Sequence, residues 1–96
     1  MAALTLDQAS IIVDKALEKG REFARRAGTN PVFLQALMAA SGGRIVPVPG
    51  GVLIRDDAGE IIGSVGISGD TSDKDETCAV HGIQSAGLTP DTGDPA

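Results

Sequence analysis

The sequence predicts a small α+β domain in which a reduced antiparallel sheet is flanked by three helices. Apolar residues recur at helical spacings in the first part of the chain, and they change to strand-type patterning between residues 51 and 67. A third helix-start signal follows this hairpin. With 96 residues, the chain has room for one hydrophobic core. We therefore expect a single domain over residues 1–87 and a disordered tail over 88–96.

A capping box marks the start of the first helix. Thr5 and Gln8 have the spacing at which each side chain satisfies the backbone N–H of the other. An apolar stripe at spacings of three and four follows, and Gly28 provides a C-terminal stop. We expect the charged residues between these positions to form a solvated face. The stripe comprises Ala9, Ile12, Val13, Ala16, Gly20, Phe23, Ala24 and Ala27.

A second, shorter helix is expected from Pro31 to about Ala40. Asn30 is a favourable helix cap, and proline is preorganised for the first helical position. The segment carries little polar surface between Val32 and Met38. We therefore expect this helix to be either wedged in the core or covered by a partner.

A β-hairpin is expected over residues 51–67. Its turn is Asp56-Asp57-Ala58-Gly59, in which Asp starts the turn and Gly accepts a positive φ. Gly63 and Gly66 leave the second strand partly bare, which indicates a bulge or a close neighbour, either a packed helix or a ligand. A third helix with a thin stripe of small residues should begin at Thr71 or Ser72 and pack closely on the sheet.

Composition argues against several classes of partner. The net charge of −5 repels phosphates, and Phe23 and Phe33 are the only aromatic residues, so the chain lacks platforms for stacking bases. We expect neither nucleic-acid nor membrane binding. No run approaches the roughly 20 apolar residues of a membrane span, and the start lacks a signal-peptide pattern. These features and the single cysteine, Cys78, predict a cytoplasmic protein without an intramolecular disulfide.

Two glycine-rich segments resemble the GlcG/HbpS haem-binding-protein family, whose domain also occurs at the C-terminus of PduO-type corrinoid adenosyltransferases. The segments are SGGRIVPVPGGVLI at residues 41–54 and GSVGISGDT at residues 63–71, and the resemblance continues through residues 73–76. It implies a profilin-like meandering sheet flanked by helices and a non-enzymatic domain that forms homo-oligomers. The ligand it implies is haem, another tetrapyrrole or a small organic acid.

One departure from this family concerns the segment after the first helix. Relatives usually carry a strand pair and a further helix before the part that corresponds to residues 24–27, whereas here the first helix runs almost directly into Gly28. The resemblance therefore implies a reduced sheet and a reduced pocket. Two alternatives follow: a purely structural assembly module or degenerate relative without a pocket, and an accessory domain of a corrinoid or glycolate-utilisation enzyme.

The turn before the third helix is a candidate anion site. Backbone N–H groups at a helix start carry partial positive charge, and nearby hydroxyls add donors. An ordinary capped turn is the alternative, because four acidic residues crowd the same end. The candidate ligand-binding residues are Ser68, Gly69, Thr71 and Ser72, and the acidic residues are Asp70, Asp73, Asp75 and Glu76.

His81 is a further candidate ligand-binding residue. It lies three positions after Cys78, a spacing that a metal or haem iron could use on one helix face. Two residues do not make a metal site, so the alternative is a surface histidine beside a small buried thiol.

The chain has no nucleophile elbow of the G-x-S-x-G type, and we expect no catalytic residues. The residues alone identify no cofactor.

Self-association is expected from the strand count. An isolated hairpin is marginal in water and leaves both outer edges unpaired. The apolar segment from Pro31 to Ala40 adds more surface than such a small fold can bury. A homodimer or larger assembly would cover both features.

Overall fold

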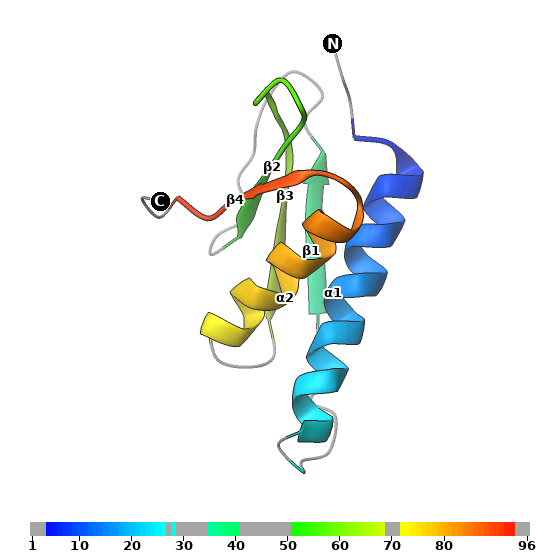
Figure 1. The fold of residues 1–96 in the computed structure, drawn as a ribbon, viewed down its shortest axis with the longest axis vertical. Helices are drawn as coiled ribbons and strands as arrows, with labels where there is room; N and C mark the ends of the chain where they lie inside the picture. The colour runs from blue at the N-terminus through cyan, green and yellow to red at the C-terminus, as the bar shows by residue number, and fades with distance from the viewer. Residues whose placement is uncertain (1–3, 27, 29–34, 41–50, 69–71, 94–96) are drawn as a thin grey trace.

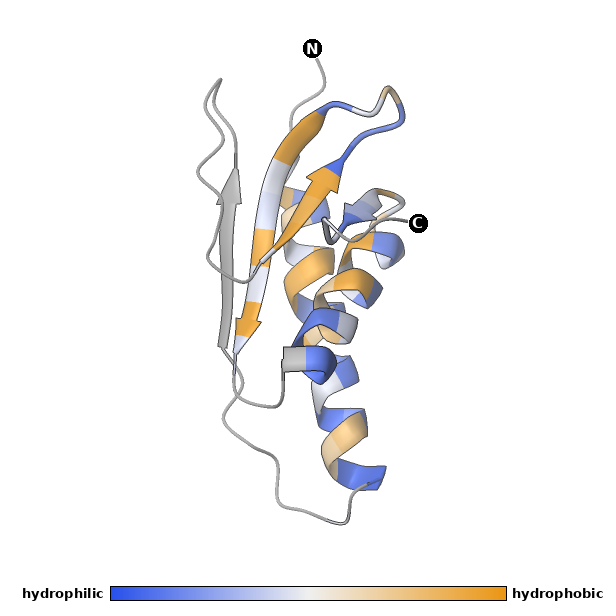
Figure 2. Ribbon diagram, turned by 90° about the vertical axis from the view of Figure 1, so that its left-hand side faces the viewer, coloured by the Kyte–Doolittle hydropathy of each residue, from blue (hydrophilic) through white to orange (hydrophobic). Residues whose placement is uncertain are grey.

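The chain forms a four-stranded antiparallel sheet with both described helices on one face (Figures 1 and 2). The computed structural model describes residues 4–26, 28, 35–40, 51–68 and 72–93. The strand order is β1-β3-β2-β4. The α+β class is therefore confirmed. The elements are α1 (Leu6–Arg26), β1 (Gln35–Ala40), β2 (Val52–Arg55), β3 (Ile61–Ser68), α2 (Ser72–Ser85) and β4 (Thr89–Asp91).

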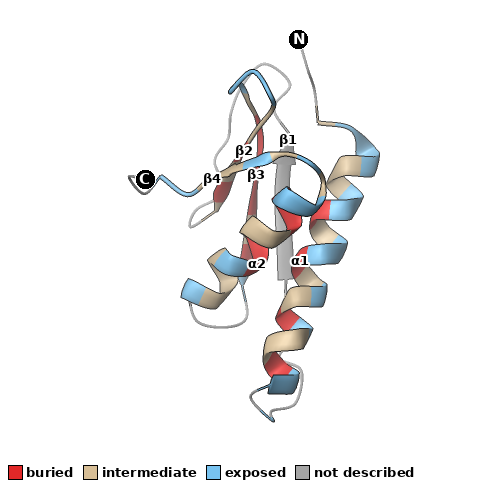
Figure 3. Ribbon diagram, in the orientation of Figure 1, coloured by how far each residue is buried: buried red, intermediate tan, exposed pale blue. Residues whose placement is uncertain are grey.

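Helix α1 begins with the predicted capping box. The Thr5 N–H donates to Gln8 Oε1 at 3.1 Å, and the Gln8 N–H donates to Thr5 Oγ1 at 3.1 Å. The buried residues of α1 recur every fourth position, so they lie along one side of the helix (Figure 3). These residues are Ile12, Ala16, Gly20 and Ala24.

The predicted second helix is wrong for residues 35–40, which form strand β1. This strand pairs antiparallel with β3, from Gln35 opposite Ser68 to Ala40 opposite Gly63. A short apolar run does not reveal its period, and the open edge of β3 offers backbone groups that need partners. The described part of the chain therefore contains two helices instead of three. The expected helix start at Asn30 and Pro31 lies outside the described residues.

The predicted hairpin is confirmed. The Asp56 N–H donates to the Glu60 carbonyl at 2.9 Å, and the Gly59 N–H donates to the Asp56 carbonyl at 3.0 Å. Asp56 Oδ1 also accepts from the N–H groups of Ala58 and Glu60, and Gly59 has φ of +80°. A register shift between Ile54 and Arg55 leaves Ile62 as the extra residue of a bulge. Ile62 is buried in the core.

Helix α2 packs most extensively on α1, although its small-residue stripe was expected to lie against the sheet. A Cβ atom on Gly82 would overlap the Ile12 carbonyl oxygen and lie 3.2 Å from Ala16 Cβ. The helix ends in a Schellman motif, because the Leu88 N–H donates to the Ile83 carbonyl at 3.2 Å and Gly87 has φ of +77°. The missing side chain at Gly82 therefore permits the close helix contact.

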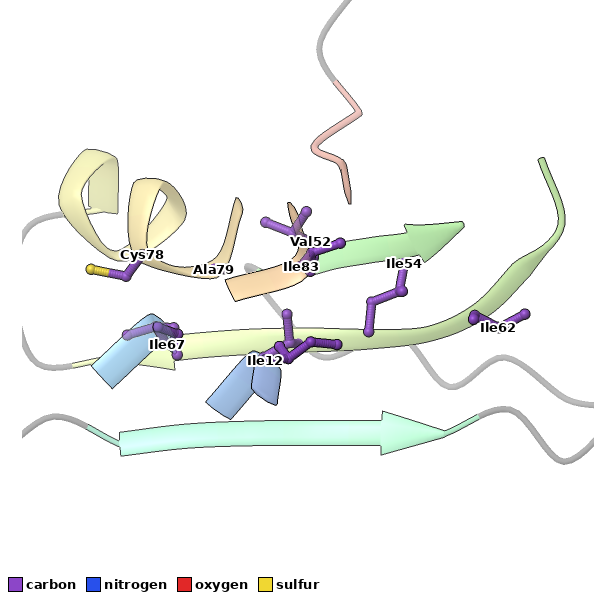
Figure 4. Close-up of a cluster of buried hydrophobic side chains, with 10 residues drawn as sticks. Ile12, Val52, Ile54, Ile62, Ile67, Cys78, Ala79 and Ile83 are labelled. Carbon is purple, nitrogen blue, oxygen red and sulfur yellow. The ribbon is translucent and has the colours of Figure 1, made fainter. Parts of the chain in front are cut away.

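The hydrophobic core lies between the helices and the sheet (Figure 4). Every member is apolar apart from the thiol of Cys78, and the largest buried side chains are isoleucines. Leu4, Phe23 and Leu88 pack against its margin. The core consists of Ile12, Ala16, Val52, Ile54, Ile62, Val65, Ile67, Cys78, Ala79 and Ile83.

Part of the expected disordered tail is strand β4, so that expectation is wrong for residues 89–91. Asp91 lies opposite Leu53, and Thr89 lies opposite Arg55. The edge of β2 supplies backbone partners, and an ion pair joins Arg55 to Asp91. A three-residue segment centred on a proline gives too little pattern to be read as a strand, although proline is compatible with an edge position.

Candidate functional site

The sheet has one face that neither described helix covers (Figure 2). Side chains alternate along a strand, and Val52 and Ile54 of β2 belong to the core beneath the helices. Leu53 and Arg55 therefore project to the opposite side. Two rules place other residues on that side. A residue directly opposite Leu53 or Arg55 on a neighbouring strand shares the side, and so does every second residue along that strand. We call this surface the helix-free face, and its residues include Leu53, Arg55, Ser64, Gly66, Ser68 and Asp91.

Arg55 and Asp91 form the main charged contact of the helix-free face. Arg55 Nε and Nη2 each lie 2.8 Å from Asp91 Oδ2, while Arg55 Nη1 donates to the Gly59 carbonyl at 2.6 Å. Asp91 Oδ1 accepts from the Gly93 N–H at 2.9 Å. The Gly93 N–H and then the Arg55 guanidinium lower the pKa of Asp91 below 3.8. The pair therefore ties β4 to β2 while the guanidinium is also held by the hairpin turn.

This contact is only partly shielded from solvent. The side chains of Arg55 and Asp91 are 35% and 29% exposed. The guanidinium is thus accessible enough to meet a ligand from solution, and its planar donors suit a carboxylate. Leu53 and Gly66, which lie on the same face, are both half-buried, whereas Ser64 is only 1% exposed. A ligand could therefore reach this face at Arg55, Leu53 and Gly66 but not at Ser64.

Two open hollows lie elsewhere among the described residues, and both carry carboxylates. The first has a volume of about 320 Å³ and lies between the start of α1, the hairpin turn and the end of α2. The second, of about 340 Å³, lies along the first turns of α2. Acidic linings favour cations over ligands that carry carboxylates. The first is lined by Gln8, Asp56, Asp57, Ala58, Ile62, Gly87 and Leu88, and the second by Asp73, Glu76, Thr77 and Val80.

The candidate anion-binding turn is described only at its two ends. Ser68 is the exposed last residue of β3, and Ser72 is the first residue of α2. Gly69 and Thr71 lie outside the described residues. Anion binding by this turn therefore stays a prediction.

His81 does not join the other candidate residues. It is half-buried on α2, and roughly two and a half helical turns separate it from Ser72, which places the two positions on opposite sides of the helix, about 13 Å apart along its axis. Cys78 is 1% exposed and belongs to the core (Figure 4). Among the described residues, no group of three or more His, Cys, Asp or Glu side chains is placed to hold a metal ion.

Sequence reasoning missed the Arg55–Asp91 contact and the hollow at the hairpin turn. Arg55 appeared as the last residue of a strand, and Asp91 lay in a segment expected to be disordered. A weak signal existed, since Thr89-Pro90-Asp91 is followed by Gly93, whose N–H the aspartate caps. The hollow depends on three segments that meet only in the folded chain.

The fold and the helix-free face define a two-layer α+β domain with helices on one side of its sheet. The family described as "Haem degrading protein HbpS-like" matches residues 2–84, and the chain therefore belongs to the HbpS-like family. Comparisons with curated proteins and with solved structures give no match. In the part of the chain that the structure describes, neither helix has the length and apolar character needed to cross a membrane.

Proposed function

We propose that this chain is a non-catalytic binding domain for haem or another tetrapyrrole. The observation that carries the proposal is the family match, which extends over residues 2–84 and names haem in its description. A small organic acid is the alternative ligand, because it would need the same type of cationic anchor. The proposed setting is the cytoplasm.

The helix-free face is the proposed binding surface. A sheet face suits a flat ligand, and Gly66 adds no side chain that would stand between such a ligand and the backbone. Leu53 supplies apolar contact. Arg55 would bind the carboxylates that tetrapyrroles such as haem carry in place of Asp91, which occupies its Nε and Nη2 donors in this structure. The acidic linings of the two hollows would repel those carboxylates. The charge pattern therefore favours the face over the hollows.

Placement of the two reactive side-chain types supports a role without catalysis. Cys78 is buried in the core, where a substrate would not reach its thiol. His81 lies on α2, whereas the proposed ligand surface is on the opposite face of the sheet. The family description speaks of haem degradation, so activity must be measured together with binding.

Titration with hemin tests this proposal. We expect a saturable change in the Soret band at about one haem per chain, and weaker binding by Arg55→Gln. His81→Ala is the matched control and should leave both folding and the titration near those of the unmodified chain. A titration without saturation would favour the structural-module alternative. Loss of the Soret band with release of a cleaved product in the presence of a reductant and oxygen would contradict the non-catalytic role.

Self-association is a second proposal, and the structure removes one argument for it, the unpaired edges of the hairpin. The hairpin edges that were expected to be bare are covered by β1 and β4. Two other features favour association. The β1 sequence, QALMAA, lacks the charges and prolines that protect natural edge strands, and α1 exposes Leu6 and Ile11.

An accessory role beside a corrinoid or glycolate-utilisation enzyme is the remaining alternative, and its test is co-purification with such an enzyme.

A further inference from the structure

We propose that the edge of β2 beneath β4 is an acceptor site for an extended peptide segment of another chain, and that this segment presents a carboxylate to Arg55. The chain's own residues 89–93 occupy the site as an exchangeable strap. The inference shares Arg55 with the proposed haem surface, but it rests on other observations, namely the backbone edge of β2 and the contact between Arg55 and Asp91. Peptide binding can therefore be tested without haem.

Arg55 is held in position by groups that do not belong to the strap. Its Nη1 donates to the Gly59 carbonyl at 2.6 Å. The turn that carries Gly59 is fixed by its own hydrogen bonds, in which Asp56 accepts from the N–H groups of Gly59, Ala58 and Glu60. The guanidinium therefore keeps its direction when the carboxylate of Asp91 leaves, and a preoriented fork loses little freedom when it binds a new carboxylate.

The strap is held far less firmly than the other strands. Strand β4 has three residues, and its central Pro90 has no N–H to donate to β2. Thr89 is exposed, and the Asp91 carboxylate is partly exposed. An ion pair that solvent can reach adds little stability on its own. These features weaken the hold of the strap on β2. Its departure would still uncover part of the core residue Ile54, which lies opposite Pro90, so the exposed area at this edge sets the cost of release.

The point at which the strap can detach lies immediately after Leu88. The Leu88 N–H is bonded to the Ile83 carbonyl, and the Leu88 side chain packs against the core. These contacts end α2 and do not involve β4. Residues from Thr89 onward can therefore leave while α2 and its cap stay formed.

The occupant's chemistry follows from the strap itself. An incoming strand that runs antiparallel to β2 would take the backbone hydrogen bonds of the edge, as β-strand addition does elsewhere. Its acidic residue would lie opposite Leu53, where Asp91 now reaches Arg55. The net charge of −5 disfavours highly acidic peptides. The favoured partner is therefore a segment with one carboxylate among uncharged residues, like LTPDTG at residues 88–93.

The test uses the full-length chain and two synthetic peptides. In Asp91→Asn, the strap loses its charge with little change of shape. Titration of this variant with acetyl-LTPDTG-amide should give saturable NMR shifts at the Leu53, Ile54 and Arg55 amides. The unmodified chain should bind about tenfold more weakly, because its own strap competes. The peptide acetyl-LTPNTG-amide should also bind about tenfold more weakly, since it lacks the charge-assisted hydrogen bonds.

Two further variants separate this site from general acidic effects. Adding Arg55→Gln to the Asp91→Asn chain should abolish the shifts. Asp57→Asn removes a carboxylate from the hairpin turn without removing any contact of Arg55, and it should behave as the unmodified chain. Equal binding of the two peptides, or an absence of shifts at β2 in Asp91→Asn, would overturn the proposal. Self-association of Asp91→Asn through β2 would also overturn it, because that variant lacks the carboxylate.

Hydrogen exchange on the unmodified chain tests strap release even if the variant does not fold. The amides of β4 should exchange at least tenfold faster than those of β3, which lies between two strands. Equal protection of the two strands would show that β4 leaves only when the whole domain unfolds, and would overturn the proposal of an exchangeable strap. A dimer of the unmodified chain that exchanges subunits and is lost in Asp91→Asn would support the site and identify a second copy as the donor.

Discussion

At the scale of single residues, Gly82 sets how closely the two helices approach. The backbone of α2 lies against the Ile12 carbonyl oxygen at this position, so the contact has no space for a side chain. The obstructing atom belongs to the α1 backbone and cannot rotate away as a side chain could. The stripe of small residues on α2 therefore indicates its close contact with α1.

We expect Gly82→Ala to destabilise the domain. Overpacking of this kind lowers the free energy of unfolding by about 1–3 kcal/mol. The higher helix propensity of alanine offsets up to about 1 kcal/mol of this loss. The net loss of unfolding free energy should be about 1–2 kcal/mol, which is measurable by urea denaturation. Gln84→Ala, at an exposed position of the same helix, is the matched control and should change stability by no more than about 0.5 kcal/mol. A Gly82→Ala chain as stable as the control would contradict the close contact.

Asp91 gives a prediction about acid stability. Its pKa in the folded chain lies below the ordinary value of 3.8, chiefly through the Gly93 N–H and then through Arg55. A lowered pKa means that the ionised group stabilises the folded state above pH 3.8, and this contribution is lost as the pH falls through the lower folded pKa. The stability difference between the unmodified chain and Asp91→Asn should therefore shrink below pH 3.8 in urea titrations. A difference that grows with acid would refute this assignment.

At the scale of elements, sequence patterns succeeded where a few neighbouring residues determine the structure. Thr5 and Gln8 cap α1 through contacts three residues apart, and Asp56 and Gly59 complete their turn within the hairpin. The patterns failed where a distant edge decides the conformation. Residues 35–40 extend because β3 offers them partners, and β4 forms because β2 does. The Arg55–Asp91 contact was not predicted for the same reason, because its two residues lie 36 positions apart in the sequence.

The strand conformation of β1 has a direct spectroscopic test. We expect NOEs between backbone protons of Met38 and Val65, which are paired in the register of β1 and β3. Backbone contacts between antiparallel partners are short, whereas a helix over residues 35–40 would give contacts to the fourth residue along the chain. Leu53 and Ser64, which are paired in the hairpin, provide the positive control. Sequential helical NOEs over residues 35–40 would contradict the strand.

At the scale of the whole molecule, the exposed apolar surface of α1 bears on association. Leu6 is 85% exposed and Ile11 is 40% exposed, and they lie about 140° apart around α1. A second copy packed on α1 would cover one of them, and an interface that also includes the start of the helix would cover both. The covering of the hairpin edges by β1 and β4 means that the fold does not need a partner to complete its ladder. Association would therefore depend on side chains more than on shared strands.

We expect the chain to form a dimer or larger assembly whose melting temperature falls on dilution. Sedimentation equilibrium at low micromolar concentrations should show the assembly, and Leu6→Gln with Ile11→Gln should shift it toward monomer. The two substitutions leave the core unchanged, so the helical content should be preserved. A well-folded monomer whose melting temperature does not change on dilution would rule out self-association.

The contact between Ile12 and Gly82 also has a consequence for synthesis on the ribosome. It joins α1 to α2, the two helices of the described part of the chain, so α1 emerges long before its main packing partner exists. The hairpin of β2 and β3 is complete earlier, yet its core face still lacks the cover that α2 supplies. A nascent chain halted before α2 has left the exit tunnel should therefore expose the apolar side of α1, and the core closes when α2 arrives.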